Sequence, residues 1–284
     1  MNKILQLRIL SLIVLLLLAL SITAGCSLFG SSIKYDGGRY SGELKDGIPH
    51  GKGKWVGPDG TTYEGEFREG TASGLGKLVF ADGLVYEGQF VNGLPHGHGR
   101  ETLPDGEIYD GDWENGLRHG WGSYSFADVI YEGKFINGAP TGTGTVTLPD
   151  GIVYVGEVEN YVSQGFGVMT WPDGKRYEGE WNDGKREGYG VLTFPNGTRY
   201  EGEFKNGVPH GYGIETWADG TVYEGEWMYG RRHGKGIYTW PDGAIYDGEW
   251  DNGLKHGFGT YTDAEGNKKE GIWEEDHFTE AEEE

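Results

Sequence analysis

A tyrosine recurs about every 23 residues through most of this chain, and it opens the same motif each time. The motif runs tyrosine, acidic residue, glycine, any residue and an aromatic residue, followed by a glycine-rich segment and by Pro/Ala-Asp-Gly. Regular copies begin at Tyr63, Tyr86, Tyr109, Tyr131, Tyr154, Tyr177, Tyr200, Tyr223 and Tyr246, and Tyr40 begins a tenth, less regular copy. Because a fixed period of roughly 20 to 50 residues marks stacked repeats, the sequence predicts an array of small units rather than one globular core.

The copy that begins at Tyr223 indicates what one unit folds into. Tyr223 to Trp227 alternates, so the tyrosine, glycine and tryptophan share one face and the two glutamates share the other. Met228 to Gly236 is rich in glycine and predicts a loop. Ile237 to Trp240 is β-branched and aromatic, which favours a second strand, and Pro241-Asp242-Gly243 is typical of a turn. Each unit is therefore predicted to be a β-hairpin.

Successive hairpins are expected to pair edge to edge, because a single hairpin is only marginally stable in water. Strands lie ~4.8 Å apart, so the two strands of each copy advance the array by ~10 Å. The predicted fold class is all-β: an elongated, twisted, single-layer antiparallel sheet of about ten tandem 23-residue hairpins. Strand glycines such as Gly202 and Gly225 leave slots for aromatic rings, so we interpret the aromatic stripe as packing rather than as a ligand site.

Composition and charge narrow the range of partners. The chain has 54 glycines, which recur in step with the tyrosines, and an aromatic content of 14%, which argues against a disordered linker. Its 45 acidic and 24 basic residues give a formal charge of −21. Nucleic acid is not an expected partner, since phosphate binding depends on clustered lysine and arginine. Direct binding to anionic lipid headgroups is disfavoured for the same reason.

The first 26 residues differ in composition from the repeats. Lys3 and Arg8 form a basic start, and Ile9 to Ile22 is an apolar run of 14 residues interrupted by two serines. A basic start, a short apolar run and small residues after it are typical of a secretory signal peptide. The run is shorter than the about 20 residues that a transmembrane helix needs.

Thr23-Ala24-Gly25-Cys26 resembles a bacterial lipobox, with threonine where that family prefers leucine. The resemblance implies cleavage before Cys26 and acylation of Cys26, the only cysteine, which would attach the protein to a membrane. Each buried methylene contributes ~0.8 kcal/mol, so two or three acyl chains give durable anchoring. By resemblance to lipoprotein sorting, Ser27 permits passage to an outer membrane, where the protein would face the periplasm. Ordinary signal cleavage and an uncleaved anchor stay open as alternatives.

The sequence thus divides into four parts. These are a lipoprotein signal peptide (1–25), the lipidated cysteine with a tether and a half-repeat cap (26–39), the repeat array (40–273) and an acidic C-terminal tail (274–284). Ile33 to Gly37 matches the second strand and turn of a unit whose first half is missing. Lys269 to Trp273 matches a first strand with lysine in place of tyrosine. The tail is expected to cap the array or to be disordered.

The segment from Tyr200 to Gly213 has the sequence Tyr-Glu-Gly-Glu-Phe-Lys-Asn-Gly-Val-Pro-His-Gly-Tyr-Gly. With the closing Asp-Gly, this pattern resembles the MORN (membrane occupation and recognition nexus) repeat family, and the resemblance covers about residues 40–273. It implies an elongated, twisted sheet of hairpins and a role in scaffolding, oligomerisation or phospholipid contact. We expect no appended enzyme domain, because the repeats extend nearly from the leader to the C-terminus.

The pattern lapses in the middle of the chain. The turn glycine is absent between Asp128 and Tyr131, and the spacing there drops to 22 residues. Val158 replaces the strand aromatic, Tyr161 the loop glycine and Gln164 the loop histidine. Because sequences break local rules at strained or functional sites, these five residues form a candidate partner surface. Repeat decay that produces a kink is the alternative.

Two sets of residues invite a metal or catalytic hypothesis. The histidines before Gly-x-Gly are His50, His96, His119, His210, His233 and His256. Neighbouring copies would lie ~10 Å apart, whereas zinc holds nitrogen ligands at about 2.0–2.1 Å, so a hydrogen bond repeated in every loop is the preferred interpretation. Acid pairs such as Glu201 and Glu203 are equivalent along the array, whereas a glycosidase needs one pair with separated pKa values. We interpret them as a solubilising stripe, and we predict no catalytic residue, no metal site and no cofactor.

The remaining hypotheses concern binding. The first is a membrane-tethered, non-enzymatic scaffold in the bacterial cell envelope that presents its sheet to an unknown protein partner or to another copy of itself. The second is glycan or cell-wall binding through exposed aromatic rings. The third is phospholipid contact, as proposed for MORN repeats, which the net charge opposes.

Overall fold

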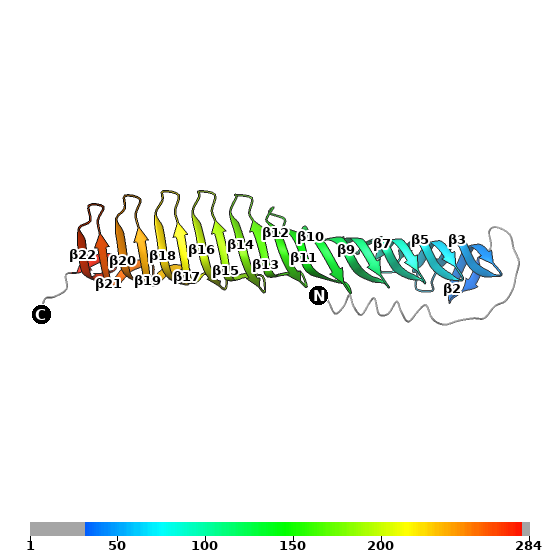
Figure 1. Cartoon of the computed structure of the whole chain (residues 1–284). Helices are drawn as coiled ribbons and strands as arrows, with labels where there is room; N and C mark the ends of the chain where they lie inside the picture. The colour runs from blue at the N-terminus through cyan, green and yellow to red at the C-terminus, as the bar shows by residue number, and fades with distance from the viewer. Residues whose placement is uncertain (1–31, 280–284) are drawn as a thin grey trace. The chain divides into compact units, whose positions relative to one another are not determined.

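The computed structural model describes residues 32–279, which form two compact units, 32–141 and 142–279. All regular structure in this part of the chain is β-strand, which confirms the predicted all-β class (Figure 1). No helix among these residues is both long and apolar enough to cross a membrane. The predicted leader (1–25), Cys26 and the end of the tail (280–284) lie outside the described residues, so the signal-peptide and lipidation assignments stay predictions.

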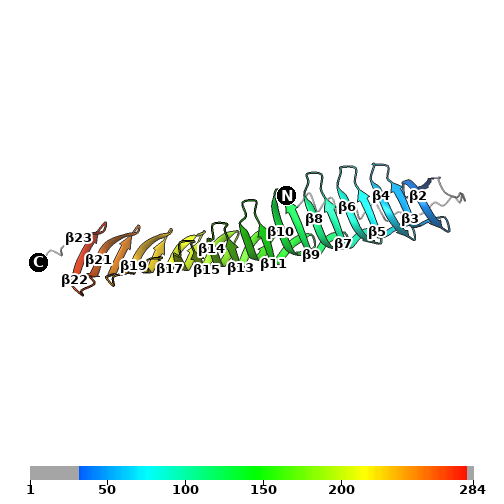
Figure 2. The same ribbon diagram turned by 90° about the horizontal axis from the view of Figure 1, so that it is seen from above.

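The first unit is an open antiparallel sheet in which each strand pairs with the next one along the chain (Figure 2). Its strands are β1 (Ile33–Tyr35), β2 (Gly38–Lys45), β3 (Ile48–Val56), β4 (Thr62–Arg68), β5 (Thr71–Val79), β6 (Val85–Val91), β7 (Leu94–Thr102), β8 (Ile108–Glu114), β9 (Leu117–Phe126) and β10 (Val129–Ile136). Strand β11 (Ala139–Thr147) contains the boundary between the units.

The second unit follows the same plan, with antiparallel pairing between consecutive strands. Its strands are β12 (Val153–Glu159), β13 (Val162–Thr170), β14 (Arg176–Asn182), β15 (Lys185–Thr193), β16 (Arg199–Lys205), β17 (Val208–Thr216), β18 (Val222–Met228), β19 (Arg231–Thr239), β20 (Ile245–Asp251), β21 (Leu254–Thr262), β22 (Lys268–Glu274) and β23 (His277–Thr279). The prediction of tandem antiparallel hairpins is confirmed in each unit.

Two kinds of turn alternate along each unit. A two-residue turn joins the strands of a hairpin with positive φ at both positions, as at Asn206 (52°) and Gly207 (88°). This geometry matches the twist of the strands and favours Asn-Gly. The wider turn between hairpins contains Pro241-Asp242-Gly243, where the Gly243 amide donates to the Trp240 carbonyl at 3.0 Å and the Ala244 amide donates to the Asp242 carboxylate at 3.0 Å. The predicted Pro-Asp-Gly turn is therefore confirmed. In the second unit the wide turns all lie on the same side, at one end of the strands (Figure 1).

The segment 228–236 is mostly strand, and its prediction as a loop is wrong. β19 already begins at Arg231, so only Tyr229 and Gly230 form the turn. Its glycines were interpreted as loop residues. Gly234 and Gly236 instead lie inside β19, where the pairing with β18 is irregular.

That irregularity is a β-bulge, which recurs in the hairpins. Gly225 pairs with Gly236 and Trp227 pairs with Arg232, so three residues of β19 lie opposite one residue of β18. Gly234, in the middle of these three, has a φ of 60°. Glycine adopts this conformation without steric cost, and extra residues in one strand are what a bulge accommodates.

Glycine pairs with glycine at the centre of the strands and makes room for tyrosine. In the second unit the register joins Gly202 to Gly213 and Gly213 to Gly225. The Tyr200 ring lies over this lane, since a Cβ on Gly213 would overlap the ring and its hydroxyl. Tyr200 is only 2% exposed. The predicted slots for aromatic rings are therefore present.

The tyrosine hydroxyl has a specific partner as well. Tyr200 donates to the backbone carbonyl of Glu203 at 3.0 Å, and Glu203 is the residue that faces the bulge. The equivalent bond, to the carbonyl three residues on, is made by Tyr40, Tyr63, Tyr86, Tyr109, Tyr131, Tyr154, Tyr177, Tyr223 and Tyr246. Each repeat-defining tyrosine thus fills space and satisfies a backbone group.

The tyrosine-bearing face of each unit is covered by its own side chains. Tyr200 packs edge to face against Phe204 at 5.1 Å and against Trp227 of the next copy at 5.1 Å. Such pairs contribute about 0.5–1.5 kcal/mol beyond the burial of their area. Basic side chains also pack on these rings; for example, the Arg232 guanidinium lies 4.5 Å from the centre of the Trp250 ring. These contacts give the aromatic stripe a packing role.

The two ends of the described chain are hairpin fragments. β1 pairs with β2 through a two-residue turn at Asp36 and Gly37. β23 pairs with β22, and the Phe278 ring packs against Trp273 at 5.3 Å. The segment predicted as an acidic tail therefore contributes a short strand at 277–279. Phe278 within the acidic run allows this pairing, because it supplies a ring for the covered face.

Candidate interaction surface

The face opposite the tyrosines carries the paired acids, and we call it the acidic face of each unit. In the second unit it holds Glu157, Glu178, Glu180, Glu201, Glu203, Glu224, Glu226, Asp247 and Glu249, all of them exposed or half-exposed. Strand alternation also places on this face the middle residue of each Gly-x-Gly and the residue two positions after it. At the centres of the strands, the acidic face therefore carries three kinds of side chain: the paired acids, the middle residue of Gly-x-Gly and the residue two positions after it.

The second acid of each pair has a structural role that the sequence analysis missed. Glu226 accepts a hydrogen bond at 3.0 Å from the amide of Lys235, which lies in the bulge. Equivalent bonds run from the amides of Lys52, Trp121, Phe166, Tyr189 and Tyr212 to Glu43, Asp112, Glu157, Glu180 and Glu203. Hydrogen bonds to an ionised acceptor are stronger than neutral ones. These acids therefore stabilise the bulge as well as carrying charge. The sequence feature that could have indicated this role is the constant separation of 9 residues between the acid and the amide that it binds.

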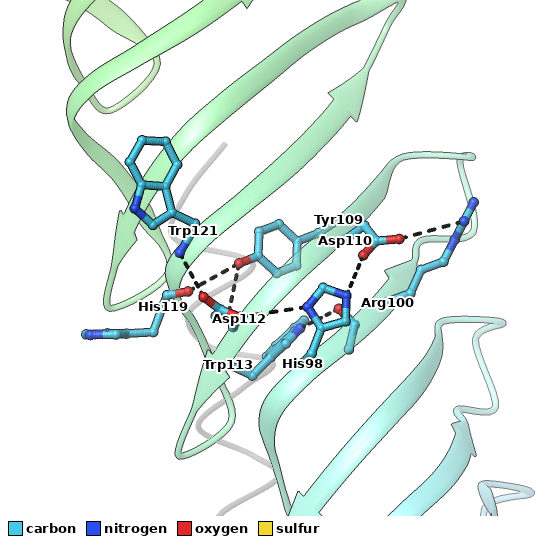
Figure 3. Close-up of polar contacts among 9 residues, drawn as sticks. His98, Arg100, Tyr109, Asp110, Asp112, Trp113, His119 and Trp121 are labelled. Atoms are coloured by element: carbon cyan, nitrogen blue, oxygen red, sulfur yellow. Dashed lines mark hydrogen bonds and ion pairs between the residues drawn. The ribbon is translucent and has the colours of Figure 1, made fainter.

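One acid pair of the first unit is shown in Figure 3. His98 lies between the two carboxylates, 3.1 Å from Asp110 and 3.7 Å from Asp112. Arg100 lies 3.9 Å from Asp110, and Asp112 accepts the amide of Trp121 at 3.1 Å. Both carboxylates are open to solvent, and both lie near the same histidine.

Aromatic side chains project from the acidic face of the second unit. The middle residues of Gly-x-Gly are exposed by 53% at Phe166, 52% at Tyr189, 50% at Tyr212 and 51% at Phe258. The Tyr189 hydroxyl donates to Glu201 at 2.8 Å and that of Tyr212 to Glu224 at 2.6 Å. These carboxylate acceptors raise the pKa of both tyrosines above the ordinary value. The sequence analysis did not single out this row, although the aromatic residues between two glycines were visible in consecutive copies.

The histidines before Gly-x-Gly lie in strands rather than in loops, and His233 is the first of the three bulge residues of β19. His119 approaches Glu114 of its own copy at 3.4 Å, whereas His233 approaches Asp251 of the next copy at 3.2 Å. Within the described chain these contacts are not equivalent, so the expectation of one hydrogen bond repeated in every copy is wrong. No group of three or more histidine, cysteine, aspartate or glutamate residues among those described could hold a metal ion.

The five residues of the predicted partner surface divide between the units. Asp128 (φ 62°) belongs to a two-residue turn that replaces the wide turn, which accounts for the shorter spacing. Tyr161 lies in a turn with a φ of 67°, where the other hairpins favour glycine. Tyr131 and Val158 are 1% and 3% exposed, so they are packing residues rather than contact residues. A partner at Asp128, Tyr161 or Gln164 stays a prediction.

Solved structures resemble this chain only weakly. The TCP10 domain of Danio rerio CPAP, in complex with a STIL peptide, is 16% identical with a TM-score of 0.29, and the alignment covers 80% of this chain and 97% of that one. The G-box domain of the microcephaly protein CPAP is 14% identical with a TM-score of 0.33, covering 79% and 100%. Virginiamycin B lyase from Staphylococcus aureus is 15% identical with a TM-score of 0.15, covering 80% and 71%. No curated protein matches the chain.

The family model described as MORN repeat matches ten successive segments of the chain. They are residues 40–62, 63–85, 86–108, 109–128, 131–153, 154–176, 177–199, 200–222, 223–245 and 246–268. Each segment begins at one of the tyrosines that define the repeat, including Tyr40 and the copy shortened near Asp128. The tyrosines, the glycine lane and the hairpin plan therefore have one explanation: the chain belongs to the MORN repeat family.

Proposed function

We propose that this protein is a non-enzymatic MORN repeat scaffold of the bacterial cell envelope, tethered to a membrane through Cys26, whose acidic face receives a protein partner. The observation that supports the proposal is the asymmetry of the sheet. In each unit one face is covered by the chain's own tyrosines, while the other leaves aromatic and acidic side chains open. Exposed apolar side chains that gather on one surface mark interaction sites.

The geometry of the acids supports a non-enzymatic role. The second acid of each pair is engaged by a backbone amide of the bulge, and the same arrangement recurs from copy to copy. For a pair of carboxylates to act as acid and base, their surroundings must push their two pKa values apart. Because the acids have the same surroundings in successive copies, no single pair is set apart as an acid and a base.

The proposed tether is tested by metabolic labelling with a palmitate analogue. The Cys26→Ala variant should lose the label, because no other cysteine is present. Ser27→Ala is the matched control, since it changes the neighbouring residue and keeps the thiol. Normal labelling of the Cys26→Ala variant would rule out the tether.

The proposed partner class is tested by retention on envelope proteins, purified sacculi and liposomes, followed by mapping of crosslinks from the tethered protein. Crosslinks to one protein through the acidic face are expected. Glycan binding is the second candidate, favoured by the exposed rings of Tyr189 and Tyr212, which could stack on sugars. Retention on sacculi alone would favour that candidate and overturn the scaffold. Binding of liposomes by the Cys26→Ala variant would instead support direct lipid contact.

A further inference from the structure

The acidic faces of the two units differ at one repeated position, two residues after the middle of Gly-x-Gly. In the first unit this position is basic in three copies, at Lys54, Lys77 and Arg100, and serine at Ser123. In the second unit it is aliphatic in four copies, at Val168, Val191, Ile214 and Ile237, and threonine at Thr145 and Thr260. The register places an acid opposite each of the basic and aliphatic residues on at least one neighbouring strand, and on both neighbouring strands for all of them except Lys54 and Val168. Lys77 lies between Glu64 and Glu87, and Ile214 lies between Glu201 and Glu224.

This exchange determines how much negative charge each face retains. In the first unit Lys54 pairs with Glu64 at 3.2 Å and Lys77 pairs with Glu87 at 2.6 Å. In the second unit the aliphatic residues offer no such partner. Ion pairs there join Arg176 to Glu178 at 2.6 Å and Arg199 to Glu201 at 2.5 Å. Within residues 142–279 the ion pairs do not engage Glu203, Glu224 or Glu226, so this face combines negative charge with apolar surface.

The exposed rings are set between these acids. Tyr189 donates its amide to Glu180 at 3.1 Å and pairs in register with Glu203. Tyr212 donates its amide to Glu203 at 3.2 Å and pairs with Glu226. A guanidinium placed here meets an aromatic face and carboxylates together, and arginine interacts favourably with both.

The spacing of the rows favours one kind of partner. Equivalent side chains recur once per two strands, a step of about 10 Å. A helix laid across the strands advances about 10.5 Å in seven residues and returns to the same side, so it can present one side chain to each copy. An extended segment covers about 10 Å in three residues, which turns successive contacts to opposite sides.

We propose that the acidic face of the second unit binds a basic amphipathic helix of a protein partner. Its arginine or lysine side chains lie between the glutamates and against Tyr189 and Tyr212, and its aliphatic side chains pack on Val191 and Ile214. This proposal rests on the proposed function for the protein nature of the partner. A second copy of this chain is a poor occupant of the same face, because its own acidic face would bring glutamate against glutamate.

The experiment measures binding of a labelled synthetic helix to the full-length protein by fluorescence anisotropy. The probe carries arginine at every seventh position, flanked by leucine, over about three heptads. One control peptide has the same composition with the arginine spacing disrupted, and another has glutamate in place of arginine. We expect binding of the spaced arginine peptide, weakened by added salt, and no comparable binding of either control.

Matched variants of the protein locate the site. Tyr189→Ser combined with Tyr212→Ser should weaken binding about tenfold, as loss of two cation–aromatic contacts implies. Leu75→Ser combined with Trp121→Ser changes exposed residues at the same repeat position in the first unit and should leave affinity within about twofold. Unchanged circular dichroism shows that both proteins are folded.

Equal losses in the two double variants, insensitivity to salt, or equal binding of the peptide with disrupted spacing would each overturn this inference. The outcome is separable from the fate of the scaffold. Native-partner crosslinks that map to the first unit would overturn the helix site and leave the scaffold standing. Retention on sacculi with no protein crosslink would overturn the scaffold itself.

Discussion

At the scale of the residue, the tyrosine that opens each repeat links three features of the hairpin. Its ring occupies the space over two paired glycines and packs edge to face against the aromatic residue of the next copy. Its hydroxyl donates a hydrogen bond to a backbone carbonyl. The first two follow from sequence, since a bare glycine beside a large ring on one strand face indicates a slot. The third does not, because the carbonyl is made available by a bulge whose register the sequence leaves undefined.

Loss of that hydroxyl should therefore destabilise the protein. Tyr200→Phe keeps the ring and leaves the Glu203 carbonyl without its donor, and we expect the free energy of unfolding to fall by about 1–3 kcal/mol. Urea denaturation followed by tryptophan fluorescence measures the change. Tyr212→Phe is the control, because its hydroxyl bonds Glu224 at an exposed position and its removal should cost less than about 0.5 kcal/mol. Equal losses in the two variants would contradict the assignment.

At the scale of the element, the hairpin shows which parts of the fold the sequence determines. Alternation in Tyr223 to Trp227 and the Pro241-Asp242-Gly243 turn gave the strand faces and the wide turn correctly. The segment 228–236 was misassigned because its glycines are equally compatible with a loop and with a bulge inside a strand. The exposed row at Tyr189 and Tyr212 was missed for the same reason, since residues placed in a loop have no defined face.

The bulge itself should depend on the acid opposite to it. Glu157 accepts the amide of Phe166 at 3.1 Å. We expect Glu157→Ala to lower the free energy of unfolding by about 0.5–1.5 kcal/mol, whereas Glu157→Gln keeps an acceptor oxygen and should recover part of the loss. Denaturation of both variants under the same conditions tests this. An alanine variant as stable as the wild type would show that the carboxylate contributes only charge.

The two-residue turn allows a prediction in the stabilising direction. Tyr161 adopts a φ of 67° where neighbouring hairpins have glycine, and a left-handed conformation costs a residue with a side chain roughly 1–2 kcal/mol. Tyr161→Gly should raise the free energy of unfolding by up to about 1 kcal/mol. The reciprocal change in the next hairpin, Gly184→Tyr at a φ of 72°, should lower it by a similar amount. A loss of stability in Tyr161→Gly would indicate that contacts of the Tyr161 ring outweigh the strain.

At the scale of the whole molecule, a single repeated motif produces the fold in both units, and function is expected where copies differ. The tyrosines, glycines and bulge acids are held nearly constant because packing requires them. The position occupied by Lys77 in one copy and Ile214 in another lies on the open face, where packing imposes no such requirement. That freedom explains why the repeat predicts the architecture of the chain closely and its partner only through the exceptions.

The repetition of buried tyrosine also predicts how the whole molecule responds to alkali. Burial raises the pKa of Tyr154, Tyr177 and Tyr246 to about 12, and it raises the pKa of Tyr63 and Tyr86 as well. At a pH below the ordinary value of 10.0 the folded and unfolded states are both protonated, so this contribution to stability is fully present. Above that pH the unfolded chain releases phenolic protons that the folded chain retains, so the free energy of unfolding falls progressively as the pH rises toward about 12. Because tyrosines of both units take part, the decline should be steep.

Tyrosinate absorbance and circular dichroism, recorded together at increasing pH, test this prediction. Most of the tyrosinate absorbance should appear over the same pH range in which the strand signal is lost. Ionisation of all the tyrosines near their ordinary pKa, with the strand signal unchanged, would contradict the burial of the repeat tyrosines.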